Sequence, residues 1–163
     1  MRGARLSSPV PKRTREELTV TERPTAGVIA NREHLLPVRV YYEDTDFTGA
    51  VYHGAYVRFL ERGRSDFLRL AGVKHAELEA AGFAFAVVRL EADFRKPARI
   101  DDAIAVRSRF LELRGPRLII GQQVARGEDV LVEARVEAAC IGLDGRPRRP
   151  PPAMTEALRP LIF

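Results

Sequence analysis

Residues 83 to 144 decide the fold, and they read FAFAVVRLEADFRKPARIDDAIAVRSRFLELRGPRLIIGQQVARGEDVLVEARVEAACIGLD. The stretch contains four consecutive segments rich in apolar and β-branched residues, which are typical of strands. The strings KPARIDD, RGP and RGED separate them as turns. In the last segment, every second residue from Val130 to Cys140 is apolar. Because short turns join consecutive strands, the stretch predicts an antiparallel sheet built of hairpins.

One more strand and a long helix precede these hairpins. The run LPVRVYYE at residues 36–43 alternates well enough for a strand, and DTDFTGA then interrupts it as a turn or loop. From Tyr52 to Leu70, apolar or small residues recur at the spacing of one helical face, and Gly72 favours a stop. A second, short helical pattern ends at Gly82. The sequence therefore predicts an α+β domain in which one long helix packs on an antiparallel five-stranded sheet.

The chain divides into a leader, one domain and a tail. Residues 1–34 have little periodic apolar pattern, three prolines and charges of both signs, so we predict a mostly disordered basic leader. Residues 35–148 form the predicted domain, and residues 149–163 form a Pro-rich tail that cannot join a sheet interior. The total of 163 residues suits one globular domain.

Charge and composition exclude several functional classes. The net charge is +5, but residues 35–144 hold sixteen basic and seventeen acidic residues, so the surplus lies at the two ends. A nearly neutral domain lacks the one-sided basic footprint of a nucleic-acid reader, and no apolar run approaches the ~18 residues of a membrane span. The single cysteine favours a reducing, cytoplasmic compartment. Three scattered histidines give no zinc-ligand spacing, so we expect no metal.

The densest polar group, EDTDFTGAVYH at residues 43–53, lies between the predicted strand and the long helix. Such a junction combines acidic side chains and an imidazole with the unsatisfied N–H groups of the first helical turn. These groups suit acyl chemistry, because a carboxylate can attack a carbonyl or activate water while backbone donors stabilise an oxyanion. Alternatively, Asp44, Thr45 and Asp46 only form a turn and a helix cap. The residues alone leave both interpretations open.

A rival interpretation starts from the same string. DTDFTG at residues 44–49 matches the D-x-D-x-T loop of haloacid-dehalogenase-like phosphatases, in which the first Asp is the nucleophile and Mg²⁺ binds nearby. Asp101 and Asp102 would then resemble the later acidic pair of that family. However, that fold alternates parallel strands with helices, whereas the residues after 82 read as consecutive hairpins. We therefore discount it.

A longer resemblance points to another family. Residues 38–68, VRVYYEDTDFTGAVYHGAYVRFLERGRSDFL, resemble the signature of the hot-dog-fold acyl-CoA thioesterases of the 4-hydroxybenzoyl-CoA thioesterase family. They are most similar to the bacterial branch associated with the Tol-Pal system. The similarity continues through residues 85–88, 97–102 and 114–115, so it covers roughly residues 36–148. It implies a curved antiparallel sheet around one long helix, and homodimers or homotetramers whose active sites lie at a subunit interface.

The resemblance also implies an acyl-CoA thioesterase that needs neither metal nor bound cofactor. Asp46 matches the catalytic carboxylate, which acts as nucleophile or general base, and His53 matches the histidine whose backbone N–H polarises the thioester carbonyl. Arg114 and Arg117 are candidates to bind the phosphates of coenzyme A, since arginine pairs with phosphate in a bidentate manner. Tyr42 is a candidate to line the substrate tunnel. The alternative function is a non-catalytic hot-dog module that binds acyl groups or acyl carrier protein.

Four other residues carry weaker expectations. Cys140 lies on the apolar face of a strand and is expected in the core, not as a nucleophile. His34 and His75 show no partner pattern and are expected to be exposed. Glu61 is a candidate to hydrogen-bond near the site or to pair with an arginine of its own helix.

Overall fold

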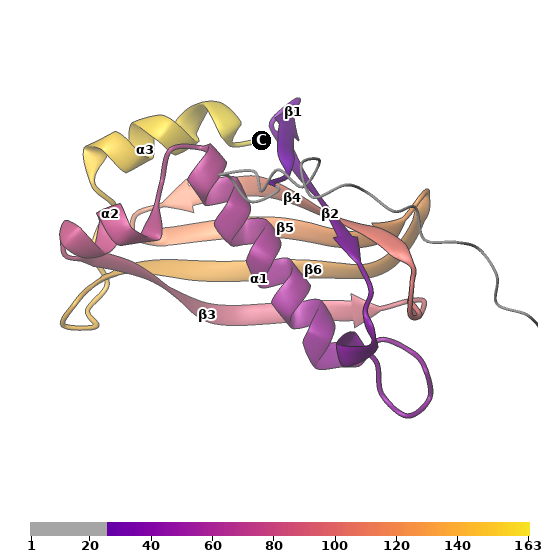
Figure 1. Cartoon of the computed structure of the whole chain (residues 1–163). Helices are drawn as coiled ribbons and strands as arrows, with labels where there is room; N and C mark the ends of the chain where they lie inside the picture. Colours follow the sequence, from indigo (N-terminus) through magenta and orange to yellow (C-terminus); the bar gives the residue numbers. More distant parts are fainter. Residues whose placement is uncertain (1–25) are drawn as a thin grey trace, which may run out of the picture.

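The computed structural model describes residues 26–163, which form a six-stranded antiparallel sheet crossed by one long helix (Figure 1). The strands are β1 (Val28–Ala30), β2 (Glu33–Arg39), β3 (Phe83–Phe94), β4 (Ala103–Arg114), β5 (Arg117–Arg126) and β6 (Asp129–Gly142). The helices are α1 (His53–Leu70), α2 (His75–Ala80) and α3 (Pro152–Leu158), with 3-10 turns η2 (Tyr42–Asp44) and η3 (Arg159–Leu161). The strand order is β1-β2-β4-β5-β6-β3. The predicted α+β class and the hot-dog arrangement are confirmed.

Helix α1 lies against the sheet because one of its faces is apolar. The buried residues recur at helical spacing and are Ala55, Tyr56, Phe59, Leu60, Gly63, Arg64, Phe67 and Leu68. Gly63 allows the closest approach, since a Cβ at this position would lie 2.7 Å from Cγ1 of Val106 on β4. A larger residue would push α1 away from the sheet.

The core has two adjoining parts. One surrounds the first half of α1 and includes Phe59, Leu60 and residues of β4 to β6. The other surrounds the second half of α1, where the rings of Phe67 and Phe110 stack with centroids 4.0 Å apart. Cys140 is fully buried on β6, as predicted.

The N-terminal boundary of the domain differs from the prediction. β1 and the start of β2 lie within residues 26–34, which we assigned to the disordered leader, so the sheet has six strands rather than five. The N–H of Gly27 donates to Oδ2 of Asp66 on α1 at 2.8 Å, a long-range contact that fastens this segment. β2 ends at Arg39 because the chain turns into η2. The rest of the predicted leader, residues 1–25, lies outside the described residues.

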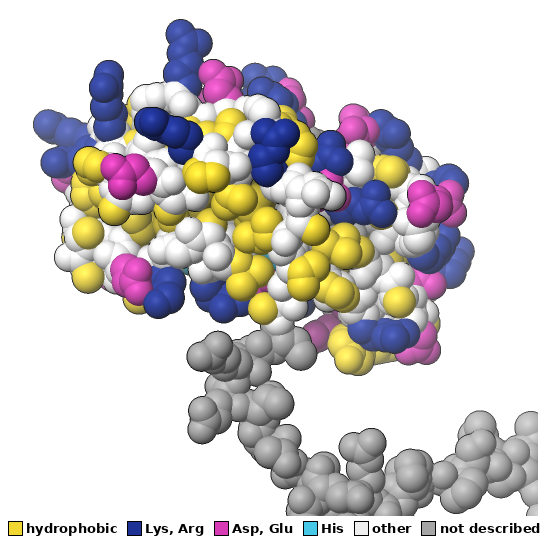
Figure 2. Space-filling model, turned by 90° about the horizontal axis from the view of Figure 1, so that it is seen from above, with side chains coloured by type: hydrophobic (Ala, Val, Ile, Leu, Met, Phe, Trp, Pro, Cys, Tyr) yellow, Lys and Arg dark blue, Asp and Glu magenta, His cyan; other side chains and the backbone are white. Residues whose placement is uncertain are grey.

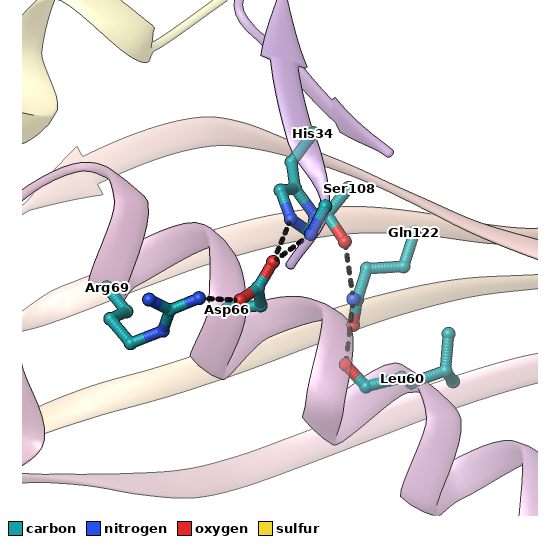
Figure 3. A network of polar contacts seen from close by, with 7 residues as sticks. His34, Leu60, Asp66, Arg69, Ser108 and Gln122 are labelled. Atoms are coloured by element: carbon teal, nitrogen blue, oxygen red, sulfur yellow. Dashed lines mark hydrogen bonds and ion pairs between the residues drawn. The ribbon is translucent and has the colours of Figure 1, made fainter. Parts of the chain in front are cut away.

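His34 is fully buried, so the prediction that it is exposed was wrong (Figure 3). Its Nε2 lies 2.8 Å from Oδ2 of Asp66, and its ring stacks on Phe67 with centroids 5.3 Å apart. Arg69 pairs with the other oxygen of the same carboxylate. Asp66 therefore supplies the partner of Nε2 of the buried His34, whereas Nδ1 has no hydrogen-bond partner among the described residues.

A second polar network connects α1 to β4 and β5 (Figure 3). Nε2 of Gln122 donates to Oγ of Ser108 at 2.8 Å and to the carbonyl oxygen of Leu60 at 3.0 Å. Oε1 of Gln122 accepts from Nη1 of Arg64 at 3.0 Å, and Arg64 also pairs with Glu61. Glu61 thus follows the second of its two alternatives, a pair with an arginine of its own helix.

The C-terminal residues, predicted as a Pro-rich tail, form α3 and η3 and pack on the domain. Pro152 occupies the first turn of α3, where a missing N–H is tolerated. Met154 and Leu158 are four residues apart and join the second part of the core. The N–H of Phe163 donates to the carbonyl oxygen of Phe110 at 3.0 Å, so the segment reaches β4.

The surface carries charges of both signs. On the face in Figure 2, Lys and Arg side chains are interspersed with acidic and apolar ones. Within residues 26–163, no helix is long and apolar enough to cross a membrane.

Candidate active site

The predicted site lies on the loop that joins β2 to α1. Thr45 and Val51 form an antiparallel bridge, and the N–H of Asp46 donates to the carbonyl oxygen of Ala50 at 3.0 Å. Gly49 closes the turn through its own N–H, which lies 3.0 Å from the carbonyl oxygen of Asp46. Its φ of 76° favours glycine. Asp46 therefore stands at the base of a tight, hydrogen-bonded turn.

Asp44 is the structural member of the D-x-D pair. It is only 5% exposed, and its Oδ2 accepts the N–H of Tyr41 at 2.9 Å. Its carbonyl oxygen accepts the N–H of Tyr52 at 2.9 Å, and Nη2 of Arg58 lies 3.9 Å from Oδ1. Asp44 holds the two ends of the loop together, so the interpretation as a turn residue is correct for this aspartate.

Asp46 is exposed and has one carboxylate oxygen free. Its Oδ1 accepts the main-chain N–H of Thr48 at 2.8 Å and the Thr48 hydroxyl at 2.6 Å. Within residues 26–163, Oδ2 has no hydrogen-bond partner. The hydroxyl and then the N–H of Thr48 lower the pKa of Asp46 below its usual value, against a weaker effect of burial, and His53 adds a smaller lowering. The carboxylate is therefore ionised at neutral pH and presents Oδ2 to solvent.

His53 is the first residue of α1, as the resemblance requires. Its imidazole is exposed and its ring centroid lies 4.4 Å from that of Tyr52. Among the described residues, its main-chain N–H has no acceptor, because it belongs to the first turn and Tyr52 provides no side-chain cap. This N–H and the positive end of an 18-residue helix are available to an oxygen that gains negative charge.

Aromatic side chains flank Asp46 on the same loop. Tyr42 is 83% exposed on η2, and Phe47 is fully exposed beside the carboxylate. Tyr41 and Tyr52 are also more than one-third exposed. This aromatic surface provides apolar contact area next to a charged group, a combination typical of ligand sites.

The structure does not bring Arg114 and Arg117 to Asp46 within one chain. Both lie at the β4–β5 turn, beside a surface hollow of about 600 Å³, and Arg117 pairs with Glu137. Through β6, Arg117 is in register with Ala86 near the start of β3, whereas the first turn of α1 contacts Phe94 at the end of β3. Eight residues of strand separate these two positions, which is about 26 Å.

A single chain leaves the site open. None of the five best-formed surface hollows of the described residues includes Asp46, His53 or Tyr42. The same part of the chain holds no group of three or more His, Cys, Asp or Glu side chains placed to bind a metal. The site consists of a carboxylate, main-chain donors and exposed aromatic rings.

Sequence reasoning missed Thr48. Its hydroxyl makes the shortest polar contact of the loop, at 2.6 Å, and its N–H adds a second contact with the same oxygen of Asp46. The signal was its place two residues after an aspartate, the spacing of a turn in which an Asp side chain accepts a main-chain N–H.

A family model described as the thioesterase-like superfamily matches residues 40–159. The chain belongs to this superfamily. The acyl-CoA thioester hydrolase YbgC of Escherichia coli is 39% identical over 117 residues, 71% of this chain and 87% of that protein. A probable thioesterase from Bartonella henselae is 43% identical, with a TM-score of 0.70 over 73% of this chain and 99% of that chain. A hypothetical protein from Thermus thermophilus is 35% identical, with a TM-score of 0.75 over 80% and 98% of the two chains.

Membership in the thioesterase-like superfamily confirms the resemblance read from residues 38–68. It also removes the phosphatase alternative, because the thioesterase-like sheet is antiparallel throughout and the two aspartates of the loop differ in burial. The match includes the loop, α1 and most of α3, so the C-terminal helix belongs to the matched domain.

Proposed function

We propose that this protein is an acyl-CoA thioesterase in which Asp46 is the catalytic carboxylate. The observation that carries the proposal is the free Oδ2 of an ionised aspartate on the loop that leads into the first turn of α1, in a thioesterase-like chain. The acyl-CoA substrate class follows the printed function of the Escherichia coli relative. Tyr42 and the neighbouring exposed rings provide contact area for the acyl part.

Two routes fit the geometry. As nucleophile, Oδ2 of Asp46 bonds to the carbonyl carbon, the C–S bond breaks, and the coenzyme A thiolate leaves and takes a proton from water. A second water then hydrolyses the mixed anhydride and restores the carboxylate. As general base, Asp46 accepts a proton from the attacking water and passes it to the departing thiolate. In both routes the N–H of His53 hydrogen-bonds the carbonyl oxygen as it gains charge.

The site requires a second copy of the chain. β3 forms one edge of the sheet, pairs only with β6 among the described strands, and leaves Val87 and Val88 about half exposed. An antiparallel pair of β3 strands around a two-fold axis would extend the sheet and cover these residues. The axis would also bring the β4–β5 turn of one subunit to the end of the sheet that carries Asp46 of its partner. Arg114 and Arg117 would thus reach the coenzyme A phosphates in the partner's site.

The compartment and partners follow from the same features. The buried, unpaired Cys140 suits a reducing compartment such as the cytoplasm. Acyl carrier protein would present its thioester on the same pantetheine arm but without the nucleotide of coenzyme A, so acyl carrier thioesters are a second substrate class to assay.

The experiment is turnover of the full chain on short, long and aromatic acyl-CoAs, with wild type, Asp46→Asn and, as the matched control, Asp101→Asn. Asp101 is an exposed loop aspartate whose carboxylate accepts no hydrogen bond from the described residues. We expect Asp46→Asn to lower kcat at least ~100-fold and to fold normally. Asp101→Asn should stay within about twofold of wild type.

Three outcomes discriminate the alternatives. Near-normal turnover of Asp46→Asn would remove the catalytic assignment. If wild type releases no coenzyme A from any substrate, the chain is a binding module. A single turnover in ¹⁸O-labelled water tests the nucleophilic route, because attack of water on Cγ of Asp46 in the mixed anhydride leaves the label in that carboxylate, whereas the general-base route never does.

A further inference from the structure

Thr48 makes a closed ring of contacts with the catalytic loop. Its hydroxyl donates to Oδ1 of Asp46 at 2.6 Å, and its N–H donates to the same oxygen at 2.8 Å. The N–H of Ala50 lies 3.3 Å from the Thr48 hydroxyl oxygen, which it can use as acceptor. A hydroxyl that accepts from one side has its proton directed to the other, and here that proton is directed at Asp46.

We propose that Thr48 is the positioning residue that selects which oxygen of Asp46 reacts. Two donors on Oδ1 fix the rotation of the carboxylate and leave Oδ2 as the free nucleophilic or basic oxygen. The inference rests on the proposed function of Asp46 and adds to it a residue that does not touch the substrate. Without the hydroxyl, the N–H of Thr48 alone would hold the carboxylate, which could then rotate.

Exposure makes this contact more important. Within a single chain Asp46 lies on the surface, so packing inside that chain does not restrict its side chain. A carboxylate free to rotate would present either oxygen to the substrate, and small errors of alignment strongly reduce the rate of an attack on a carbonyl. The Thr48 hydroxyl therefore restricts the rotation of the Asp46 carboxylate, as packing around a buried carboxylate does at other sites.

Thr48 has a larger effect on the pKa of Asp46 than the charged groups nearby. His53 on α1 has a smaller lowering effect on the pKa of Asp46 than either Thr48 contact. Nη1 of Arg99 lies 3.8 Å from the position of a Cβ on Gly49, but Arg99 is not among the groups that shift the pKa of Asp46. Asp44 is buried and turned toward Tyr41. Loss of the Thr48 hydroxyl should therefore raise the pKa of Asp46 toward its ordinary value.

The test compares Thr48→Val, which has the same shape without the hydroxyl, with Thr48→Ser, which keeps the hydroxyl. Thr45→Val is the matched control, because the Thr45 hydroxyl belongs to the same loop but donates to the carbonyl oxygen of Tyr42 at 2.9 Å. Two measurements are made on the full chain: titration of the Asp46 carboxyl by ¹³C NMR, and kcat and KM for an acyl-CoA at pH 7.

We expect Thr48→Val to raise the pKa of Asp46 and to lower kcat about tenfold with little change in KM. Thr48→Ser should resemble wild type in both measurements, and Thr45→Val should leave the pKa of Asp46 unchanged. Since Asp46 is ionised at pH 7 in every variant, its charge does not change, and a lower kcat reports alignment.

The proposal is overturned if Thr48→Val keeps kcat within twofold of wild type, or if Thr45→Val loses as much activity as Thr48→Val. An equal loss in Thr48→Ser would also overturn it, because shape rather than the hydroxyl would then matter. If wild type hydrolyses no acyl-CoA, the function of Asp46 fails first, and the positioning role fails with it. The NMR titration still reports the hydrogen bond in that case, so the two failures are distinguishable.

Discussion

The proposed sharing of the active site between two subunits predicts that two inactive variants restore each other's activity. The perturbations are Asp46→Asn in one chain and the double substitution Arg114→Gln and Arg117→Gln in another. The loop of Asp46 leads into the first turn of α1, which contacts the Phe94 end of β3, whereas Arg117 is in register with Ala86, about 26 Å away along the same strand. The proposed antiparallel β3 pair would bring the partner's β4–β5 turn to the Asp46 end of the sheet, with the partner's β5 three strand spacings, or about 14 Å, from β3. Each proposed site would then take one group from each chain.

The size of the rescue follows from this geometry. A charge-assisted hydrogen bond contributes about 1.5–3 kcal/mol, so loss of the arginines should lower kcat/KM at least about tenfold. When equal amounts of the two variants mix at random, about half of the dimers contain one chain of each. In these mixed dimers one site is intact and the other lacks both groups. The mixture should therefore recover about a quarter of the wild-type kcat/KM.

The assay unfolds and refolds the two variants together and measures hydrolysis at an acyl-CoA concentration far below KM. Each variant refolded alone is the control. If Asp46 and the arginines served the same site from the same chain, no intact site could form, and the mixture would stay at about 5% of wild type or less. That result would refute the shared site. Normal kcat/KM of the arginine variant alone would refute the role of Arg114 and Arg117 in binding phosphates.

Two further predictions concern the dimer edge and the buried pair. Val88→Lys should abolish the dimer in sedimentation velocity and most of the activity, because it places two lysines near the two-fold axis. Val28→Lys on β1, the opposite edge strand, should leave the dimer and the activity intact. An active Val88→Lys dimer would contradict the β3 pairing. Asp66→Asn should lower the free energy of unfolding in urea by about 1–3 kcal/mol at pH 7. Burial opposes ionisation of Asp66, but hydrogen bonds from Arg69, Gly27 and His34 outweigh it and lower its pKa. A carboxyl whose pKa is lower in the folded than in the unfolded protein stabilises the fold at pH values above its unfolded pKa of about 3.9. This stabilisation is lost as the pH falls through the pKa of the folded state. The difference between wild type and Asp66→Asn should therefore shrink by pH 3, and an equal difference at both pH values would contradict the argument.

The spacing of apolar residues along the chain correctly predicted the long helix and the four long strands. The long helix was placed within one residue of α1, and β3 to β6 coincide with the four segments read from residues 83–144. Helix α3 also carried a usable signal, since Met154 and Leu158 are four residues apart after a proline that suits a first turn. The prolines of residues 149–163 favoured a tail, but those at residues 150–152 precede and begin a helix instead.

β1 and the burial of His34 had no local signal. β1 has three residues, and its neighbour Gly27 is held by Asp66, 39 positions along the chain. His34 has the same partner, 32 positions away. A histidine with no nearby acidic residue at helical or strand spacing reads as exposed, and only tertiary structure reveals a carboxylate that arrives from α1.

The site, too, has features that the sequence indicates and features that only the structure reveals. Residue types alone could not separate Asp44 from Asp46, and the family resemblance made that choice. The structure gives the physical difference. The carboxylate and the carbonyl oxygen of Asp44 accept hydrogen bonds from the two ends of the loop, whereas Asp46 keeps one carboxylate oxygen free.

The proposed thioester site also needs surrounding surface to hold the acyl group, and the described part of one chain does not provide it. Asp46, Phe47 and Tyr42 are all exposed, so the loop supplies the reacting groups without walls around them. A ring as large as Phe47, fully exposed in a single chain, gains contact only when another surface approaches the loop. β3 is the long edge strand that could bring such a surface, since β1 has only three residues. In the proposed dimer, pairing of the two β3 strands would also cover the site, so a variant that stays monomeric should retain the ionised Asp46 but not the activity.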